Sequence, residues 1–338
     1  MRGTLKPFLA AVMLTMTLAQ ARARSVEIAN AEDLVPVPGG RWIIASSMAG
    51  GAATSGRIVA IDPKTGRLVP LYPGARAEGE ATTPDCREEV ASSDFKPHGV
   101  SLATAPDGRL RLYVVNHGAR ESVEMFVLLP GQAPRLRWIG CARAPAGLFA
   151  NSVAALADGR LFVTNMGRPL DGSTPISAMG GEVAAWSPRG GWHSVPGSAT
   201  VGPNGIIARP DGRTLYVASW GGKALVELKP GETGTTRRTL PLNLLPDNLR
   251  WSGRGTILVG GQSTSPGLVT ECYTSTRTHC RIPSTIVEVD PVPLTVRCAR
   301  PAPIDMATVA VEVDRRVWVG TARGSRIEQL PGLACPPG

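Results

Sequence analysis

Polar residues stand at one recurring position of the chain, directly before a short apolar run that leads into a turn. They are Glu32, His98, Asn151, Asn204, and Asp247 or Asn248, with a looser copy at Thr308. In the clearest copy, His98 precedes the apolar run and Asp107-Gly108 makes the turn. Because the polar residue holds the same place in each copy, we expect these side chains to meet in the folded protein.

The side chains of this set offer the oxygen atoms that a hard cation binds. Glu32 and Asp247 bring carboxylates, and Asn151, Asn204 and Asn248 bring amide carbonyls. This donor set suits Ca²⁺ before Mg²⁺ and far before zinc. A bound ion would also explain how two carboxylates can share a narrow space. A single Asn or Asp often only caps a turn, so the prediction depends on the position that the residues share.

Turns recur along the chain at spacings typical of propeller blades. They fall at Gly39-Gly40, Asp107-Gly108, Asp158-Gly159, Asp211-Gly212, Gly253-Arg254-Gly255 and Asp314-Arg315. The Asp-Gly pairs are structural, because hairpin turns need their backbone conformation. No amphipathic helix of useful length interrupts the strands. We therefore predict an all-β protein, a six-bladed β-propeller over residues 26–338, with the polar residues at one mouth of its channel. A pair of β-sandwiches is the alternative.

The first 25 residues read as a secretory signal. Basic residues precede the apolar stretch 8–18, and small residues follow it. Cleavage after Ala21 gives a signal peptide of residues 1–21; Ala23 is the next candidate site, and an uncleaved anchor is the alternative. No other stretch is apolar enough to span a membrane. We expect a secreted or periplasmic protein.

Six cysteines follow this signal, an even number that predicts disulfides in an oxidising compartment. Fifteen pairings are possible. The spacing favours Cys272 with Cys280 across a polar hairpin tip, and leaves two guesses, Cys86 with Cys141 and Cys298 with Cys335.

The net charge of +9 comes mostly from arginines scattered through loops. Because the chain has no Lys/Arg run and no interleaved aromatic residues, we expect no nucleic-acid partner. The sequence also lacks the Gly-x-Ser-x-Gly motif of serine hydrolases and the His-Glu-x-x-His motif of zinc hydrolases.

Several segments keep the order and approximate spacing of motifs known from one family. They are Ala31–Leu34, Pro97–Ser101, Val114–His117, Asn204–Ile206, Asp247-Asn248, Thr308–Ala310 and Gly320-Thr321. Together they resemble the paraoxonase/arylesterase family, within the wider senescence-marker/gluconolactonase-like group of six-bladed propellers. The resemblance covers nearly the whole chain after the signal. It implies a calcium-dependent hydrolase of lactones and aryl esters.

The resemblance also assigns individual residues. It makes Glu32, Asn151, Asn204, Asp247 and Asn248 ligands of the catalytic calcium, and His98 and His117 the histidine pair of the family. A second, structural calcium of the family would use Asp33 and the carbonyl of Val100. The further aspartate of that site is replaced here by Ser152, which removes a charged ligand. Mammalian members tie their two ends together by a disulfide, whereas this chain has no cysteine before Cys86.

These assignments imply calcium-assisted hydrolysis of an ester or lactone. Calcium would polarise the carbonyl, while His98, oriented by His117, takes a proton from water. An unperturbed imidazole has a pKa of about 6.5, which suits a base. Asp247 is the competing base.

Two other functions remain open from the sequence. One is a sugar lactonase of the gluconolactonase type, and the other is a non-catalytic propeller that binds a ligand. The expected substrate or ligand is a small molecule in each case, and partner proteins stay undetermined.

Overall fold

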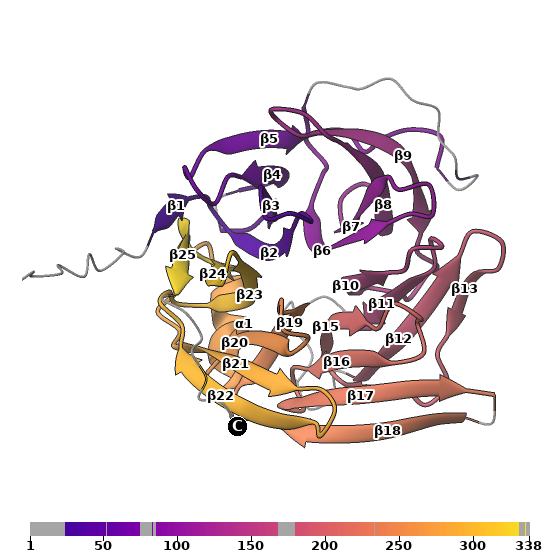
Figure 1. Ribbon diagram of the computed structural model, residues 1–338, viewed down its shortest axis with the longest axis vertical. Coiled ribbons are helices and arrows are strands. Elements are labelled where there is room, and N and C mark those ends of the chain that lie inside the picture. Colours follow the sequence, from indigo (N-terminus) through magenta and orange to yellow (C-terminus); the bar gives the residue numbers. More distant parts are fainter. Residues whose placement is uncertain are drawn as a thin grey trace, which may run out of the picture.

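The computed structural model describes residues 24–51, 53–74, 83, 86–167, 180–232, 234–330 and 335. Six antiparallel sheets follow one another around a ring, as Figure 1 shows. The first full strand of each sheet contacts the corresponding strands of the two neighbouring sheets, so these six strands surround the central channel. The predicted six-bladed propeller is confirmed, and the sandwich alternative is wrong.

The first five blades take their strands in chain order from the channel outward. Blade 1 comprises β2 (Ala31–Pro36), β3 (Ile43–Ser47), β4 (Arg57–Ile61) and β5 (Leu68–Tyr72). Blade 2 comprises β6 (Pro97–Thr104), β7 (Leu110–Asn116), β8 (Ser122–Leu129) and β9 (Arg135–Arg143). Blade 3 comprises β10 (Ala150–Ala155), β11 (Leu161–Asn165), β12 (Gly180–Ser187) and β13 (Gly191–Ser194), and the short β14 (Thr200–Val201) pairs with β12.

Blade 4 comprises β15 (Pro203–Ala208), β16 (Leu215–Ser219), β17 (Ala224–Gly231) and β18 (Gly234–Pro241). Blade 5 comprises β19 (Leu245–Trp251), β20 (Ile257–Gln262), β21 (Ser284–Asp290) and β22 (Thr295–Pro301). Blade 6 comprises β23 (Ala307–Val313), β24 (Arg316–Thr321), β25 (Arg326–Leu330) and, from the other end of the chain, β1 (Ser25–Glu27).

Apolar side chains between adjacent blades hold the ring together. The cluster between blades 1 and 2 includes Ile44, Ile58, Phe95, Val114 and Phe126, all fully buried. Most of the apolar surface removed from water lies in such clusters, which makes burial the main favourable contribution to the fold.

The cysteines pair as Cys86–Cys141, Cys272–Cys280 and Cys298–Cys335, so all three predicted pairings are confirmed. Such bonds are typical of oxidising compartments. The segment at Cys272 is not a hairpin tip, because it lies in the helix α1 (Pro266–Thr274), which the sequence reading did not anticipate. No helix in the described part of the chain is long and apolar enough to cross a membrane. The predicted signal peptide lies outside the described residues.

The strand β1 closes the ring, because it pairs with β25 in the last blade. The strands β1 and β25 lie side by side in Figure 1, indigo beside yellow. Val26 and Ile28 of this segment are buried, whereas Glu27 between them is exposed. Pairing of strands from the two ends of the chain therefore closes the ring.

We expect Ile28→Ala to lower the free energy of unfolding by about 2–5 kcal/mol, because it opens a cavity at the ring closure. Glu27→Ala on the exposed face is the matched control and should change it by no more than about 0.5 kcal/mol. Urea unfolding measures both. Equal stability of the two variants would contradict the closing role of this segment.

Candidate metal and active site

The inner strands bring the predicted polar residues together by a shared irregularity. Each inner strand changes its pairing register at the polar position, as between Ala31 and Asp33 or between Pro97 and Val100. Such a bulge re-aims a side chain that would otherwise follow the alternation of the strand. The strands approach each other so closely that a side chain at Gly99 or Gly205 would collide with the backbone of the next blade.

Four buried side-chain oxygens at this end of the channel accept no hydrogen bond from any residue that the structure describes. They are Glu32 Oε2, Asn151 Oδ1, Asn204 Oδ1 and Asn248 Oδ1, from four different blades. An unpartnered buried oxygen costs free energy, so native proteins rarely leave one without a partner. A hard cation would satisfy all four at once, and the donor set therefore fits calcium.

Neighbouring groups hold these oxygens in place. Asn248 donates from Nδ2 to Glu32 Oε1 at 2.7 Å, which leaves Oδ1 of Asn248 and Oε2 of Glu32 free. Gln262 donates from Nε2 to Asp247 Oδ2 at 2.8 Å, and Trp220 fixes Gln262 by donating from Nε1 to its Oε1 at 3.0 Å. The five candidate ligands share a sequence position that marks them, whereas no sequence pattern marks the two supporting residues, Gln262 and Trp220.

The two carboxylates among the candidate ligands have raised pKa values. Burial raises the pKa of Glu32 well above its usual range, and the nearby Asp33 and Asp247 add to the shift. Burial raises the pKa of Asp247 to about 7, with a further increase from Asp33. A cation between them would lower both values, because opposite charge favours the ionised form.

The two predicted histidines are in contact, and a third residue extends the pair. His98 Nδ1 lies 3.0 Å from His117 Nε2, and His117 Nδ1 lies 2.9 and 3.0 Å from the oxygens of Glu121. With Glu121 ionised and both rings neutral, His117 donates to Glu121 and accepts from Nδ1–H of His98. Nε2 of His98 keeps its lone pair and lies 3.7 Å from Glu32 Oε1.

The pKa of His98 differs from the value expected of an isolated imidazole. Burial, then the charges of His117 and Arg323, lower it to about 3. The expectation of a value near neutrality is therefore corrected: His98 is neutral throughout the physiological range. Its availability as a proton acceptor does not depend on pH there, although its basicity in the resting site is weak.

A pocket of about 220 Å³ joins the histidines to the candidate ligands. His98, His117, Asn151, Asn204 and Asp247 all line it. The remaining lining residues are mostly apolar: Met48, Ala49, Phe149, Met166, Trp220 and Tyr273, together with Arg323. The pocket thus holds space for a small organic molecule beside Asn151 and Asn204, two of the four residues that bear the unpartnered oxygens.

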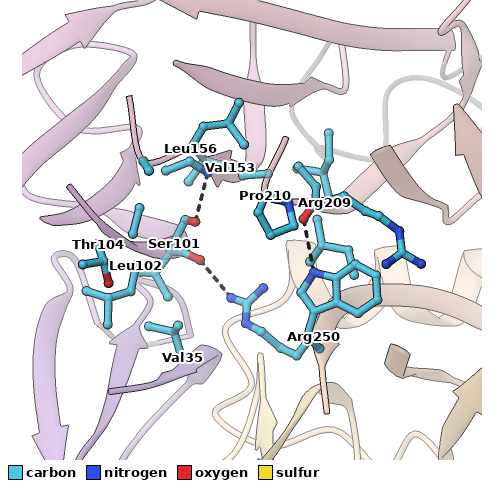
Figure 2. Close-up of a pocket in the computed structure, with 18 of the residues that line it drawn as sticks. Val35, Ser101, Leu102, Thr104, Val153, Leu156, Arg209, Pro210 and Arg250 are labelled. Atoms are coloured by element: carbon cyan, nitrogen blue, oxygen red, sulfur yellow. Dashed lines mark hydrogen bonds between the residues drawn. The ribbon is translucent and has the colours of Figure 1, made fainter. Parts of the chain in front are cut away.

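The residues proposed for a second calcium are already bound to a side chain. Arg250 donates from Nη2 to both oxygens of Asp33, at 2.6 Å each, and to the carbonyl of Val100 at 2.9 Å. Figure 2 shows Arg250 pointing toward the strand that carries Ser101. A fixed guanidinium thus meets both groups, and they do not fit a second ion. No sequence motif marks this role of Arg250.

The opposite end of the channel carries a larger cavity of about 600 Å³ (Figure 2). Its walls are mainly aliphatic and come from the later parts of the inner strands, as with Val35, Leu102 and Val153. Neither the histidines nor the five predicted ligands of the catalytic calcium line it, so the candidate chemistry lies at the first end.

Comparisons with known proteins agree with the fold. No protein-family model matches the sequence, and no curated protein matches it. Similar solved structures include a putative gluconolactonase (16% identity, TM-score 0.55, 91% of this chain and 92% of that chain covered) and a gluconolactonase from Xanthomonas campestris (16%, 0.54, 92% and 91%). Another is regucalcin, a calcium-binding protein from Agrobacterium tumefaciens (12%, 0.56, 91% and 91%).

At these identities the likeness shows a shared fold alone. The chain is thus a six-bladed propeller like those of the gluconolactonase and regucalcin group. The resemblance to the paraoxonase family depends on the sequence motifs, because none of these comparisons supports it.

We expect the calcium-free protein to lose stability as the pH rises from about 4 to about 7. The pKa of Asp247 is 3.8 in the unfolded reference and about 7 in the folded protein, so the folded state binds the extra proton in this window. A raised folded pKa stabilises the protein below the unfolded value, and this contribution disappears as the pH rises through the folded value.

Calcium should offset this loss by binding only the folded state, by about 2.7 kcal/mol at a concentration a hundred times its Kd. Melting temperatures at pH 5 and pH 7, with calcium and with chelator, measure the effect. Asp247→Asn should flatten the pH dependence in chelator, whereas Asp211→Asn in an exposed turn should leave it unchanged. Identical melting with calcium and chelator at pH 7 would refute the metal site.

Proposed function

We propose that this protein is a calcium-dependent hydrolase of lactones and of aryl or carboxylic esters. One observation carries the proposal: four unpartnered buried oxygens from four blades lie at one end of the channel, and two of the residues that bear them, Asn151 and Asn204, line the same pocket as His98. The four oxygens suit a bound cation, and Nε2 of His98 suits the role of proton acceptor for water. The predicted signal and the three disulfides support a location outside the cytoplasm for this activity.

Glu32, Asn151, Asn204, Asp247 and Asn248 would hold the ion. When bound there, calcium supplies a Lewis acid that polarises a carbonyl and stabilises the negative charge that develops on its oxygen. Asn248 and Gln262 restrain the two carboxylates through the hydrogen bonds described above. This restraint keeps the ligands in place before the ion binds, which lowers the cost of ordering them.

His98 would take the proton of the attacking water at Nε2. The hydrogen bond from its Nδ1–H to His117 holds the ring in this tautomer, and Glu121 holds His117 in turn. As His98 gains positive charge, the carboxylate of Glu121 stabilises it through the intervening ring. This support offsets the weak basicity of the resting imidazole. Asp247 remains the competing base, because its carboxylate lines the same pocket as His98.

Sugar lactones are the second candidate substrates, because two of the similar structures are gluconolactonases. The walls of the pocket favour the first candidate instead. Met48, Phe149, Met166 and Trp220 offer few hydrogen bonds to a polyhydroxylated ring. Such a ring would leave its hydroxyl groups unpaired, which costs affinity.

Replacing a ligand and replacing the base should have different consequences. Asn204→Ala removes one neutral oxygen ligand, so activity should fall and partly recover when calcium is raised. His98→Gln leaves every proposed ligand in place and should lower kcat/KM by about a hundred- to ten-thousandfold without rescue by calcium. Glu121→Gln should lower kcat, because it removes the charge that stabilises protonated His98, and it should leave calcium binding unchanged.

The measurement is hydrolysis of a γ-lactone, an aryl ester and an aldonolactone, with calcium or chelator. His193→Gln, on an exposed part of β13, is the matched control. Near-normal turnover by His98→Gln would make Asp247 the base. Preference for the aldonolactone would select the sugar lactonase, and calcium binding without turnover would leave a non-catalytic propeller.

A further inference from the structure

A buried arginine without an acidic partner lines the candidate active-site pocket. Arg323 follows β24, has 4% of its surface exposed, and borders the pocket together with His98 and Asp247. Its charge is close enough to His98 to lower the pKa of that histidine. No sequence motif marked this residue.

The guanidinium is held in a fixed orientation by neutral groups. Nη1 donates to the carbonyl of Ala322 at 2.9 Å, and Nη2 donates to the carbonyl of Tyr273 at 3.3 Å. One face lies over the ring of Tyr273, 4.9 Å from its centroid, and a side chain at Gly50 would collide with the group. The chain thus packs around the guanidinium and fixes its plane.

Arg323 lacks two kinds of partner: a hydrogen-bond acceptor for its Nε and a negative charge for its guanidinium. Its Nε is buried and donates to no described residue, and no carboxylate of the described chain lies within ion-pair distance of the guanidinium. Burying a charge without an ionic partner is costly, so proteins rarely do so outside binding sites. When calcium is bound, its charge and those of Glu32 and Asp247 cancel, and the pocket keeps the positive charge of Arg323.

We propose that Arg323 binds a carboxylate on the substrate, so that the preferred substrates are small lactones or esters that carry a second, ionised carboxyl group. This inference rests on the proposed hydrolase function. A planar guanidinium suits a carboxylate because it can donate two parallel hydrogen bonds, here from Nε and an adjacent Nη. The volume of about 220 Å³ limits the substrate to a compact molecule. Arg323 is thus a specificity-determining residue.

The first test compares two substrates on the wild-type protein. A γ-lactone with a ring carboxylate and the primary amide of the same compound differ only in charge. We expect kcat/KM to be about ten- to a hundredfold higher for the carboxylate, as befits one charge-assisted hydrogen-bonded pair. Salt should reduce this preference. Equal kcat/KM for the two compounds would overturn the inference but not the hydrolase proposal, and turnover of neither compound would overturn both.

The second test alters the arginine. Arg323→Met should abolish the preference for the carboxylate, and Arg323→Lys should keep only part of it, because lysine retains the charge and loses the planar fork. Arg213→Met, in an exposed turn of blade 4, is the matched control and should keep the wild-type ratio. A loss shared equally by both substrates would overturn the inference, since Arg323 would then only hold the Tyr273 segment.

A binding measurement checks the same contact without catalysis. Calorimetric titration of the calcium-loaded protein should show glutarate binding at least tenfold more tightly than pentanoate, and Arg323→Met should remove this difference. If that variant fails to fold, as its melting curve would show, the wild-type comparison of glutarate with pentanoate decides. Equal affinities for the two acids would refute the carboxylate site.

Discussion

The ion pair between Arg250 and Asp33 in the channel is the contact on which the site depends. Arg250 comes from the inner strand of blade 5 and also donates from Nε to the carbonyl of Leu34 in blade 1. With the bond to Val100, it joins the inner strands of blades 5, 1 and 2. Removing one partner of such a pair would leave an uncompensated buried charge, which is strongly destabilising. The pair therefore fixes the distances between blades that the ligands beside it require.

The same pair divides the acidic groups of the channel into two classes. Asp33 receives its positive partner from the chain itself, together with backbone donors at Leu34 and Val100. Within the described residues, neither Glu32 nor Asp247 forms an ion pair with a lysine or an arginine. His98 lies 3.7 Å from Glu32 but is neutral. Burial is the main cause of the raised pKa values of both carboxyl groups. The charge of Asp33 is thus paired within the protein, whereas those of Glu32 and Asp247 are available to a bound cation.

The fold and the five candidate ligands could be predicted because both depend on local sequence. A repeated polar residue before an apolar run marks the bulge of every inner strand, and the bulge aims that residue into the channel. The supporting groups could not be predicted in this way. Arg250 and Asp33 are 217 residues apart, and Trp220 and Gln262 are 42 apart. The pKa of His98 likewise follows from burial by other blades, which no local pattern contains. Only Glu121, four residues after His117, was within reach of a local reading.

The channel holds two buried arginines, and their different surroundings separate scaffold from function. Arg250 meets a carboxylate and several carbonyls, so its donors are occupied and its charge is compensated within the chain. Arg323 meets carbonyls and an aromatic ring only, and its Nε has no acceptor among the described residues. Both guanidinium groups lose their hydration on burial, but only that of Arg250 gains a carboxylate partner within the described chain. A protein that keeps the second arginine buried and uncompensated must recover the desolvation cost from a molecule outside the chain, and the pocket it borders is where such a molecule would lie.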